Sequence, residues 1–112
     1  MATSNLLLNY TWALRYEDRE IPISVSRTRN GMSSIVAVSE TGGIGSVFDV
    51  NKNGVECYLG SRGDGVPEAF ARSLTDILNV QTVLLTLAVT SLDADLAKTL
   101  LSSIRSHTDT LG

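Results

Sequence analysis

Apolar residues alternate with a period of two through the first half of the chain, and this alternation limits the fold more than any other feature. One side of the first extended segment carries Leu6, Leu8, Tyr10, Trp12, Leu14 and Tyr16. The other side carries polar residues such as Asn9, Thr11 and Arg15. Successive side chains of a strand point to opposite faces, so the segment is predicted to be a long, half-buried strand.

Four more strands are predicted before any helix. Their ranges are 21–25, 34–40, 44–50 and 55–59, and they are separated by short turns such as Asn30-Gly31 and Asn53-Gly54. Asn-Gly favours the positive φ angles of a tight hairpin, so the five strands are expected to follow one another as an antiparallel meander. Ile35–Val38 is apolar on both sides, which predicts a central strand covered on each face.

The period changes to that of a helix in the second half. Pro67–Leu78 has apolar residues at helical spacing, with Glu68 in its first turn. Thr82–Thr90 follows as a buried strand, and Ser91 is expected to cap a second helix, followed by a frayed tail from His107. Residues 1–112 are therefore expected to form one α+β domain with about six antiparallel strands and two helices, which cover at least one sheet face.

Composition points to an intracellular binding protein. The chain has 43% hydrophobic residues and a net charge of −3, which argues against nucleic-acid binding. It has one cysteine, Cys57, and no export signal or membrane span was recognised, so the cytoplasm is expected, with the nucleus as a second compartment. Cys57 and the single histidine, His107, lie 50 positions apart, so neither a catalytic residue nor a metal site nor a cofactor is predicted.

Three local patterns have simpler explanations than the chemistry they suggest. Asp49–Gly54 matches the first six positions of a calcium loop, but Gly60 stands where the bidentate Glu should be, so a hairpin turn is predicted. The glycine-rich stretch 41–46 lacks the spacing of a phosphate-binding loop and is predicted to be a tight turn. Tyr10, Trp12 and Tyr16 resemble a base-stacking platform, yet few basic residues accompany them, which favours core packing or a protein interface.

The loop between the fifth strand and the first helix is the candidate protein-binding segment. Gly60, Gly63 and Gly65 predict an exposed loop, and Ser61, Arg62 and Asp64 are its predicted contact residues. Arg62-Gly63-Asp64 is also an integrin-type tripeptide, which matters only outside cells. On the strands, Leu7, Ala13 and Tyr58 are expected to need cover from a helical layer or from a partner.

The order of elements in the second half resembles a known family. Glu56-Cys57-Tyr58-Leu59-Gly60 closes a strand, and a polar loop, the helix Pro67–Leu78, the strand Thr82–Thr90 and a last helix follow. This order is similar to that of the small eukaryotic proteasome assembly chaperones, the third and fourth members of that group, with the third favoured by the two strands at 34–40 and 44–50. The resemblance extends from about Ile21 to Ile104 and rests on element order and lengths.

The resemblance implies a six-stranded antiparallel sheet with helices and a function without catalysis. It implies that the chain pairs with a related small chaperone as a heterodimer, contacts alpha subunits, promotes assembly of the alpha-subunit ring of the 20S proteasome, and leaves before maturation. A homodimer is a further expectation for the isolated chain. Two alternatives stay open: a roadblock-like or longin-like scaffold module, which usually has a helix between its early strands, and a ligand-binding domain, which needs convergent polar groups.

Overall fold

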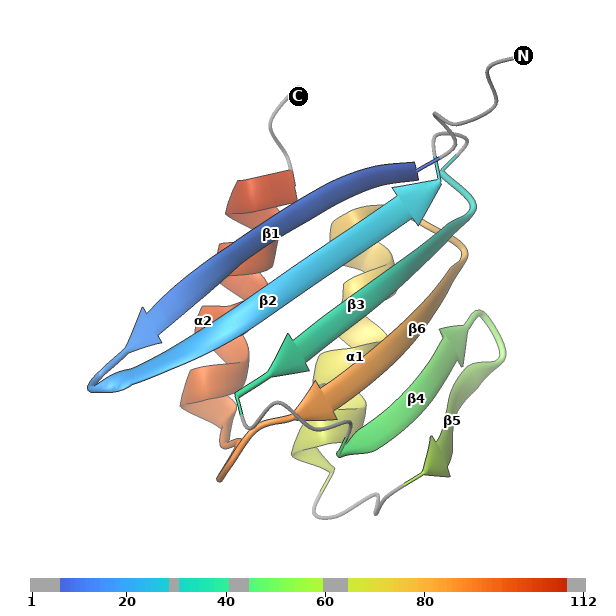
Figure 1. The fold of residues 1–112 in the computed structure, drawn as a ribbon. Coiled ribbons are helices and arrows are strands. Elements are labelled where there is room, and N and C mark those ends of the chain that lie inside the picture. The colour runs from blue at the N-terminus through green and yellow to red at the C-terminus, as the bar shows by residue number, and fades with distance from the viewer. Residues whose placement is uncertain (1–6, 29–30, 41–44, 60–64, 109–112) are drawn as a thin grey trace.

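The computed structural model describes residues 7–28, 31–40, 45–59 and 65–108. These residues form a six-stranded sheet and two helices (Figure 1). In chain order the elements are β1 (Leu7–Tyr16), β2 (Arg19–Thr28), β3 (Ser33–Ser39), β4 (Ser46–Asn51), β5 (Gly54–Leu59), α1 (Val66–Leu78), β6 (Thr82–Ala88) and α2 (Ala94–Thr108). The predicted α+β class, strand number and element order are confirmed.

The spatial order of the strands differs from a meander. The sheet runs β1-β2-β3-β6-β4-β5, so β6 lies between β3 and β4. β6 is parallel to β3 and antiparallel to β4, whereas the other neighbouring pairs are antiparallel. The prediction that five consecutive strands pair in turn was wrong, because β4 and β5 form a separate hairpin. The last strand joins that hairpin to the first three strands.

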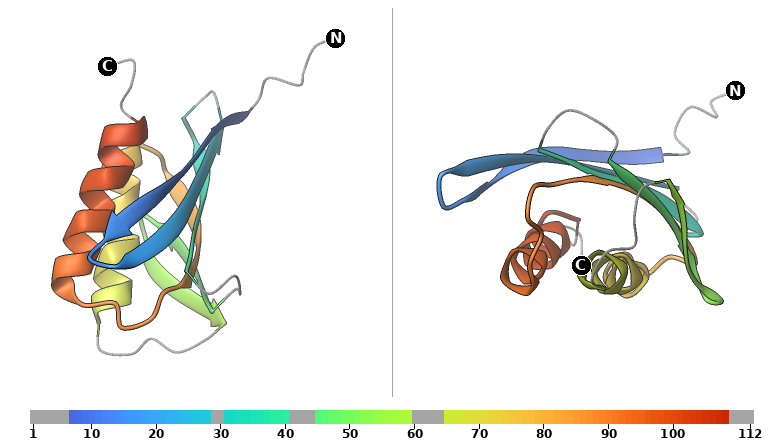
Figure 2. Two further views of the ribbon diagram at one scale, coloured as in Figure 1. Left: turned by 60° about the vertical axis from the view of Figure 1, so that its left-hand side comes forward. Right: turned by 90° about the horizontal axis from the view of Figure 1, so that it is seen from below.

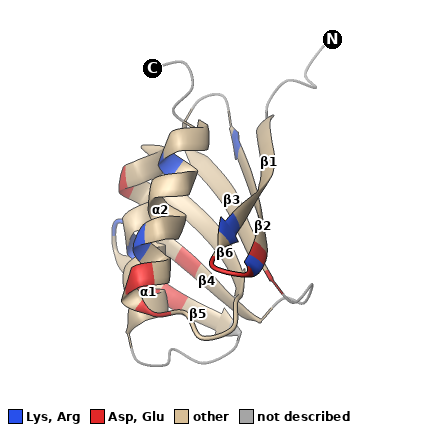
Figure 3. Ribbon diagram, turned by 90° about the vertical axis from the view of Figure 1, so that its left-hand side faces the viewer, with Lys and Arg blue, Asp and Glu red and all other residues tan. Residues whose placement is uncertain are grey.

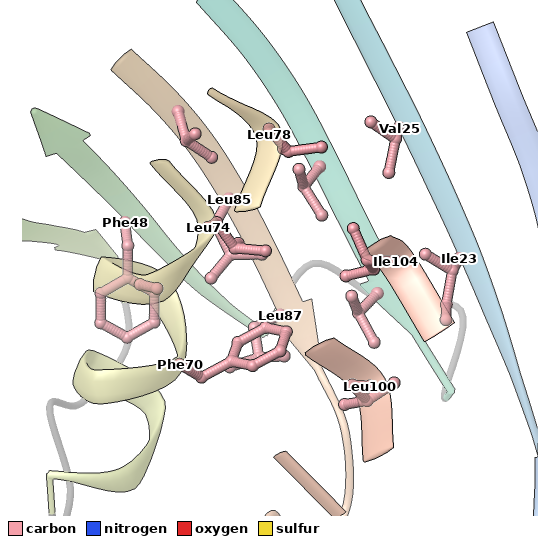
Figure 4. Close-up of a cluster of buried hydrophobic side chains, with 14 of the residues drawn as sticks. Ile23, Val25, Phe48, Phe70, Leu74, Leu78, Leu85, Leu87, Leu100 and Ile104 are labelled. Carbon is pink, nitrogen blue, oxygen red and sulfur yellow. The ribbon is translucent and has the colours of Figure 1, made fainter. Parts of the chain in front are cut away.

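Both helices pack on the same face of the sheet (Figure 2). The core lies between them and the strands, with Phe48 and Leu85 from the sheet facing Phe70 and Leu74 of α1 (Figure 4). α2 closes the other side of this core with Leu96, Leu100 and Ile104, all fully buried. The strands thus have a helix-covered face and an opposite face that no element of the described chain covers.

The absence of helices from the second face corrects the prediction for the third strand. Val36 and Val38 point to the helices and are fully buried, but Ile35 is 51% exposed on the other face. β3 is central in the sheet as predicted, yet this chain covers it on one side only.

The helix ends agree with the sequence for α1 and differ for α2. Pro67 lies in the first turn of α1, and Asn79 ends that helix in the left-handed conformation, with φ of 55°. The cap of α2 is Asp93 rather than the predicted Ser91, because the Leu96 N–H donates to Asp93 Oδ1 at 2.9 Å. α2 continues to Thr108, so His107 belongs to its last turn and not to a frayed tail.

Gly45 marks the point where the β4 segment first meets β6. Its φ is +66°, and a Cβ built there would lie 2.3 Å from the carbonyl oxygen of Leu87. Both the backbone conformation and this close approach require glycine.

Candidate protein interface

The uncovered face of the sheet, called the open face below, is built by alternate residues of all six strands. Pairing in register brings Ile35 of β3 beside Leu84 of β6, and Leu84 beside Asp49 of β4. The same row across the sheet contains Asn9, Ser26, Ile35, Leu84, Asp49 and Glu56. A neighbouring row contains Thr11, Ser24, Ala37, Thr86 and Val47.

The centre of the open face exposes large apolar side chains. Leu84 is 38% exposed and Ile35 is 51% exposed, and they are direct neighbours. Tyr58 on the edge strand β5 is 60% exposed. Single exposed apolar residues are common on protein surfaces, whereas neighbouring ones on a sheet face make that face a candidate interaction surface.

The Tyr58 hydroxyl points toward β4, the neighbouring strand. It donates to Asp49 Oδ2 at 3.0 Å and lies 3.4 Å from Glu56 Oε1. The hydrogen bond to Asp49 and its negative charge raise the pKa of Tyr58. The phenol of Tyr58 therefore stays neutral. Its hydroxyl lies beside the carboxylates of Asp49 and Glu56.

Charge on the open face lies at one end of β1 and β2 and on the β4–β5 side, where Asp49 pairs in register with Leu84. Arg15 and Glu20 pair in register at one end, and Asp49 and Glu56 lie at the β4–β5 side. Between them the outward residues of β1, β2, β3 and β6 are uncharged, and Ser26 donates to Asn9 Oδ1 at 2.6 Å while the Ser33 and Thr82 hydroxyls lie 3.0 Å apart. These polar groups are satisfied within the sheet, so a partner can cover them at little desolvation cost.

The size of the open face fits a protein partner. Six strands about 4.8 Å apart and roughly seven residues long give a flat area on the order of 550 Å². A standard protein interface buries ~800 Å² of accessible surface on each side, which is of the same order. A broad and largely neutral sheet face suits another protein surface better than a small ligand, which needs a concave site.

An ion pair between Arg19 and Glu40, called the latch below, joins strand ends at one end of the sheet. Arg19 at the start of β2 donates Nε and Nη2 hydrogen bonds to Glu40, at 2.8 and 2.7 Å, just beyond β3. Arg19 also donates to the Thr90 carbonyl, and the Thr90 N–H donates to Glu40 Oε1 at 3.0 Å, after β6 ends. The Arg19 guanidinium and the Thr90 N–H lower the pKa of Glu40 to about 2. The latch ties three strands together at one end of the sheet.

The residues predicted from sequence have several outcomes. Ser61, Arg62 and Asp64, the predicted contact loop, lie outside the described residues, as do residues 41–44 of the glycine-rich stretch and the side chain of Leu7. Ala13 and Tyr58 are exposed on the open face, where cover was expected.

Asp49–Gly54 forms the predicted hairpin between β4 and β5, with Asn53 N–H donating to Asn51 Oδ1 at 2.7 Å. Cys57 is half-buried against the core.

The aromatic residues of β1 pack against α2 and form no stacking platform. Trp12 Nε1 donates to Ser103 Oγ at 2.9 Å, and its ring stacks on His107 with centroids 4.2 Å apart. The Tyr16 hydroxyl donates to Asp95 Oδ2, which raises the pKa of Tyr16 to about 12. Of the two readings left open, core packing is confirmed.

Ile35 and Leu84 are candidate interface residues that sequence reasoning missed. Both stand in segments that are apolar on both sides, Ile35–Val38 and Val83–Val89, which predicted burial on two faces. The signal was present, but a doubly apolar strand is also found where a second chain supplies the cover.

Comparison with known proteins finds a similarity of fold. No family model and no curated protein sequence matches the chain. A chain in the crystal structure of a novel chaperone complex for yeast 20S proteasome assembly superposes with a TM-score of 0.64 at 14% sequence identity. The match covers 91% of this chain and 98% of the yeast chain.

No helix among the described residues has the length and apolarity that a membrane crossing requires. No group of three or more His, Cys, Asp or Glu side chains within the described ranges is arranged to hold a metal ion.

Proposed function

We propose that this protein is a chaperone of 20S proteasome assembly that works paired with a related small chaperone. The observation that carries the proposal is the shared fold with the yeast chain, over 91% of one and 98% of the other. A near-complete match of two small chains supports a common role better than a match to one module of a large protein. The finer steps of the proposal are contact with alpha subunits, promotion of the alpha-subunit ring, and release before maturation.

The open face supports pairing as the way the protein acts. Ile35 and Leu84 lie at the centre of a broad sheet face, which a second sheet of the same kind would cover. The yeast chain belongs to a chaperone complex, so a partner chaperone is the first candidate for the cover. We expect this face to bind the related chaperone in a heterodimer, and to mediate a weaker homodimer when that partner is missing.

Affinity purification of the tagged full chain from its own cells tests the proposed function. Mass spectrometry should find a second small chaperone and proteasome alpha subunits, without mature beta subunits. Recovery of trafficking proteins instead would favour a roadblock-like or longin-like scaffold. A preparation with no proteasome subunit under mild lysis would contradict the proposal.

A matched pair of variants separates pairing from folding. Leu84→Asp on the open face should release the second chaperone, since it places a charge at the centre of the interface. Ser106→Asp, on an exposed position of α2 outside the open face, should retain it. Both variants should keep the far-ultraviolet circular dichroism spectrum of the unaltered protein, which shows that lost pairing is not lost folding.

A further inference from the structure

Two shallow hollows join on the solvent side of the helix pair, away from the sheet. The first is about 390 Å³ and is lined by Gly65, Val66, Ala69, Phe70, Ser73, Ala94, Ala97, Lys98 and Leu101. The second is about 220 Å³ and is lined by Ile77, Lys98, Leu101, Ser102 and Arg105. They share Lys98 and Leu101, so together they form one continuous groove, called the helix groove below.

The helix groove exists because small residues line its floor. Ala69 and Ser73 of α1 face Ala94 and Ala97 of α2, and none of these fills the space between the helices. The large residues of both helices are turned to the sheet instead, as the buried Leu74 illustrates. Leu101 is half-buried and lines both hollows.

The charge of the helix groove is opposite to that of the protein as a whole. The chain has a net charge of −3, yet Lys98 and Arg105 line the groove and no carboxylate among the described residues does. Basic segments of α2, blue in Figure 3, follow the acidic first turn of that helix. Asp95, one turn before Lys98, is engaged with Tyr16 on the β1 side.

Lys98 and Arg105 are available to an incoming ligand. Both are exposed, and neither side chain has a hydrogen bond or an ion pair within the described part of the chain. They stand seven positions apart on α2, which is about 10.5 Å along a helix axis. Residues seven apart lie on nearly the same side of a helix, so the two charges form one row beside the apolar floor.

A helix is the element that fits this groove. The backbone groups of α1 and α2 are engaged in the helices, so an added strand would find no edge to pair with. A ridge of apolar side chains on a third helix can enter a groove between two others, and helix axes pack 8–10 Å apart. Two basic residues in a chain of net negative charge are too few to hold a nucleic-acid backbone.

We propose that the helix groove binds an acidic amphipathic helix of a partner protein. Its apolar ridge lies over Ala69, Ala97 and Leu101, and two of its carboxylates, about two turns apart, pair with Lys98 and Arg105. The groove lies on the opposite side of the molecule from the open face, so both surfaces can be occupied at once (Figure 2). This binding does not depend on a role in proteasome assembly.

The test uses a fluorescent synthetic peptide of about 18 residues, with Leu and Ala on one face and Glu at two positions seven apart. Fluorescence anisotropy should show saturable binding to the unaltered full chain. The double variant Lys98→Glu/Arg105→Glu should weaken binding about tenfold, because two exposed ion pairs are together worth about 1.4 kcal/mol. A peptide with Lys in place of both Glu should show the reverse preference and bind the double variant more tightly.

Two controls keep the result interpretable. Arg72→Glu changes the same charge on an exposed position of α1 outside the groove, and should leave the affinity for the acidic peptide unchanged. Leu84→Asp on the open face should also leave it unchanged. Unchanged thermal unfolding of the double variant would show that it is folded.

Three outcomes would overturn the proposal. One is no saturable binding of the acidic peptide to the unaltered chain. Another is equal binding of the acidic and basic peptides, or equal binding to the unaltered chain and the folded double variant. The third is tighter binding of a labelled duplex DNA than of the acidic peptide, which would assign Lys98 and Arg105 to phosphate binding.

Discussion

Leu84 and Leu85 are neighbours in β6, yet the two faces of the sheet give them opposite environments. Leu85 is fully buried under the helices, whereas Leu84 is 38% exposed beside Ile35 on the open face. The four inner strands show the same contrast, with buried side chains on the helix-covered face and mostly half-buried or exposed ones on the other. The difference separates residues that hold the chain together from residues that are available to a partner.

The contrast also explains why the sheet is stable without a second layer of helices. The large fully buried side chains lie between the helix-covered face and the helices; examples are Phe48 on the sheet and Ile104 on α2. On the open face, hydrogen bonds between neighbouring strands join Ser26 to Asn9 and Ser33 to Thr82. An interface added there gains apolar burial at Leu84 and Ile35.

The pair Leu84→Ala and Leu85→Ala should give the largest difference in stability between the two faces. Leu85→Ala leaves a cavity in the core and should lower the free energy of unfolding by about 3 kcal/mol. Leu84→Ala removes a partly exposed side chain and should lower it by less than about 1 kcal/mol. Urea denaturation followed by circular dichroism measures both. Equal losses in the two variants would show that the open face is covered within the isolated chain.

Gly45→Ala should have the next largest effect, because it disturbs the attachment of β4 to β6. The added Cβ would meet the Leu87 carbonyl oxygen at 2.3 Å, at a positive φ. A cost of about 2 kcal/mol in the free energy of unfolding is expected from strain of this kind. Gly31→Ala is the matched control, since Gly31 also has a positive φ but nothing lies within 4 Å of the added Cβ. A smaller loss at Gly45 than at Gly31 would contradict the close approach.

Glu40→Gln should change how stability depends on pH. The folded pKa of Glu40 is about 2, below the ordinary value of 4.5, so its pairing with Arg19 stabilises the fold at pH above 4.5. That contribution is lost as pH falls from about 4.5 through about 2. Thermal unfolding should therefore occur at a lower temperature in Glu40→Gln than in the unaltered protein at neutral pH, and the difference should narrow in acid. A difference that stays constant with pH would contradict the latch.

Tyr16→Phe should have the smallest effect, and on the alkaline side. The hydrogen bond to Asp95 raises the pKa of Tyr16 to about 12, so its contribution is present below pH 10 and is lost as pH rises through about 12. Ultraviolet absorbance of phenolate should show one tyrosine fewer titrating near pH 12 in Tyr16→Phe. Identical titration curves for the two proteins in that range would show that Tyr16 is not bonded to Asp95 in solution.

The sequence predicted the elements well because they depend on local periodicity. The alternation of Tyr10, Trp12 and Leu14 and the helical spacing of Phe70 and Leu74 each report a buried side, and the structure has strands and a helix there. The placement of β6 between β3 and β4 depends on which strand edges meet after folding. Nothing in a single strand such as Thr82–Ala88 specifies its neighbours.

The candidate interface was only partly predictable for a related reason. Tyr58 and Ala13 stood out as apolar residues on polar sides of their strands, and both are exposed on the open face. Ile35 and Leu84 did not stand out, because apolar residues on both sides of a strand are typical of helices on both faces. His107 was assigned to a frayed tail, because its contact with Trp12 joins residues at opposite ends of the chain.

We propose that the open face is the surface that a partner chaperone covers. Hydroxyl-radical footprinting of the full chain, alone and in the purified pair with the small chaperone that copurifies, tests it most directly. We expect oxidation of Leu84 and Tyr58 to fall in the pair, while oxidation of Leu101 in the helix groove does not change. Unchanged oxidation of Leu84 and Tyr58, together with protection of Leu101, would contradict it.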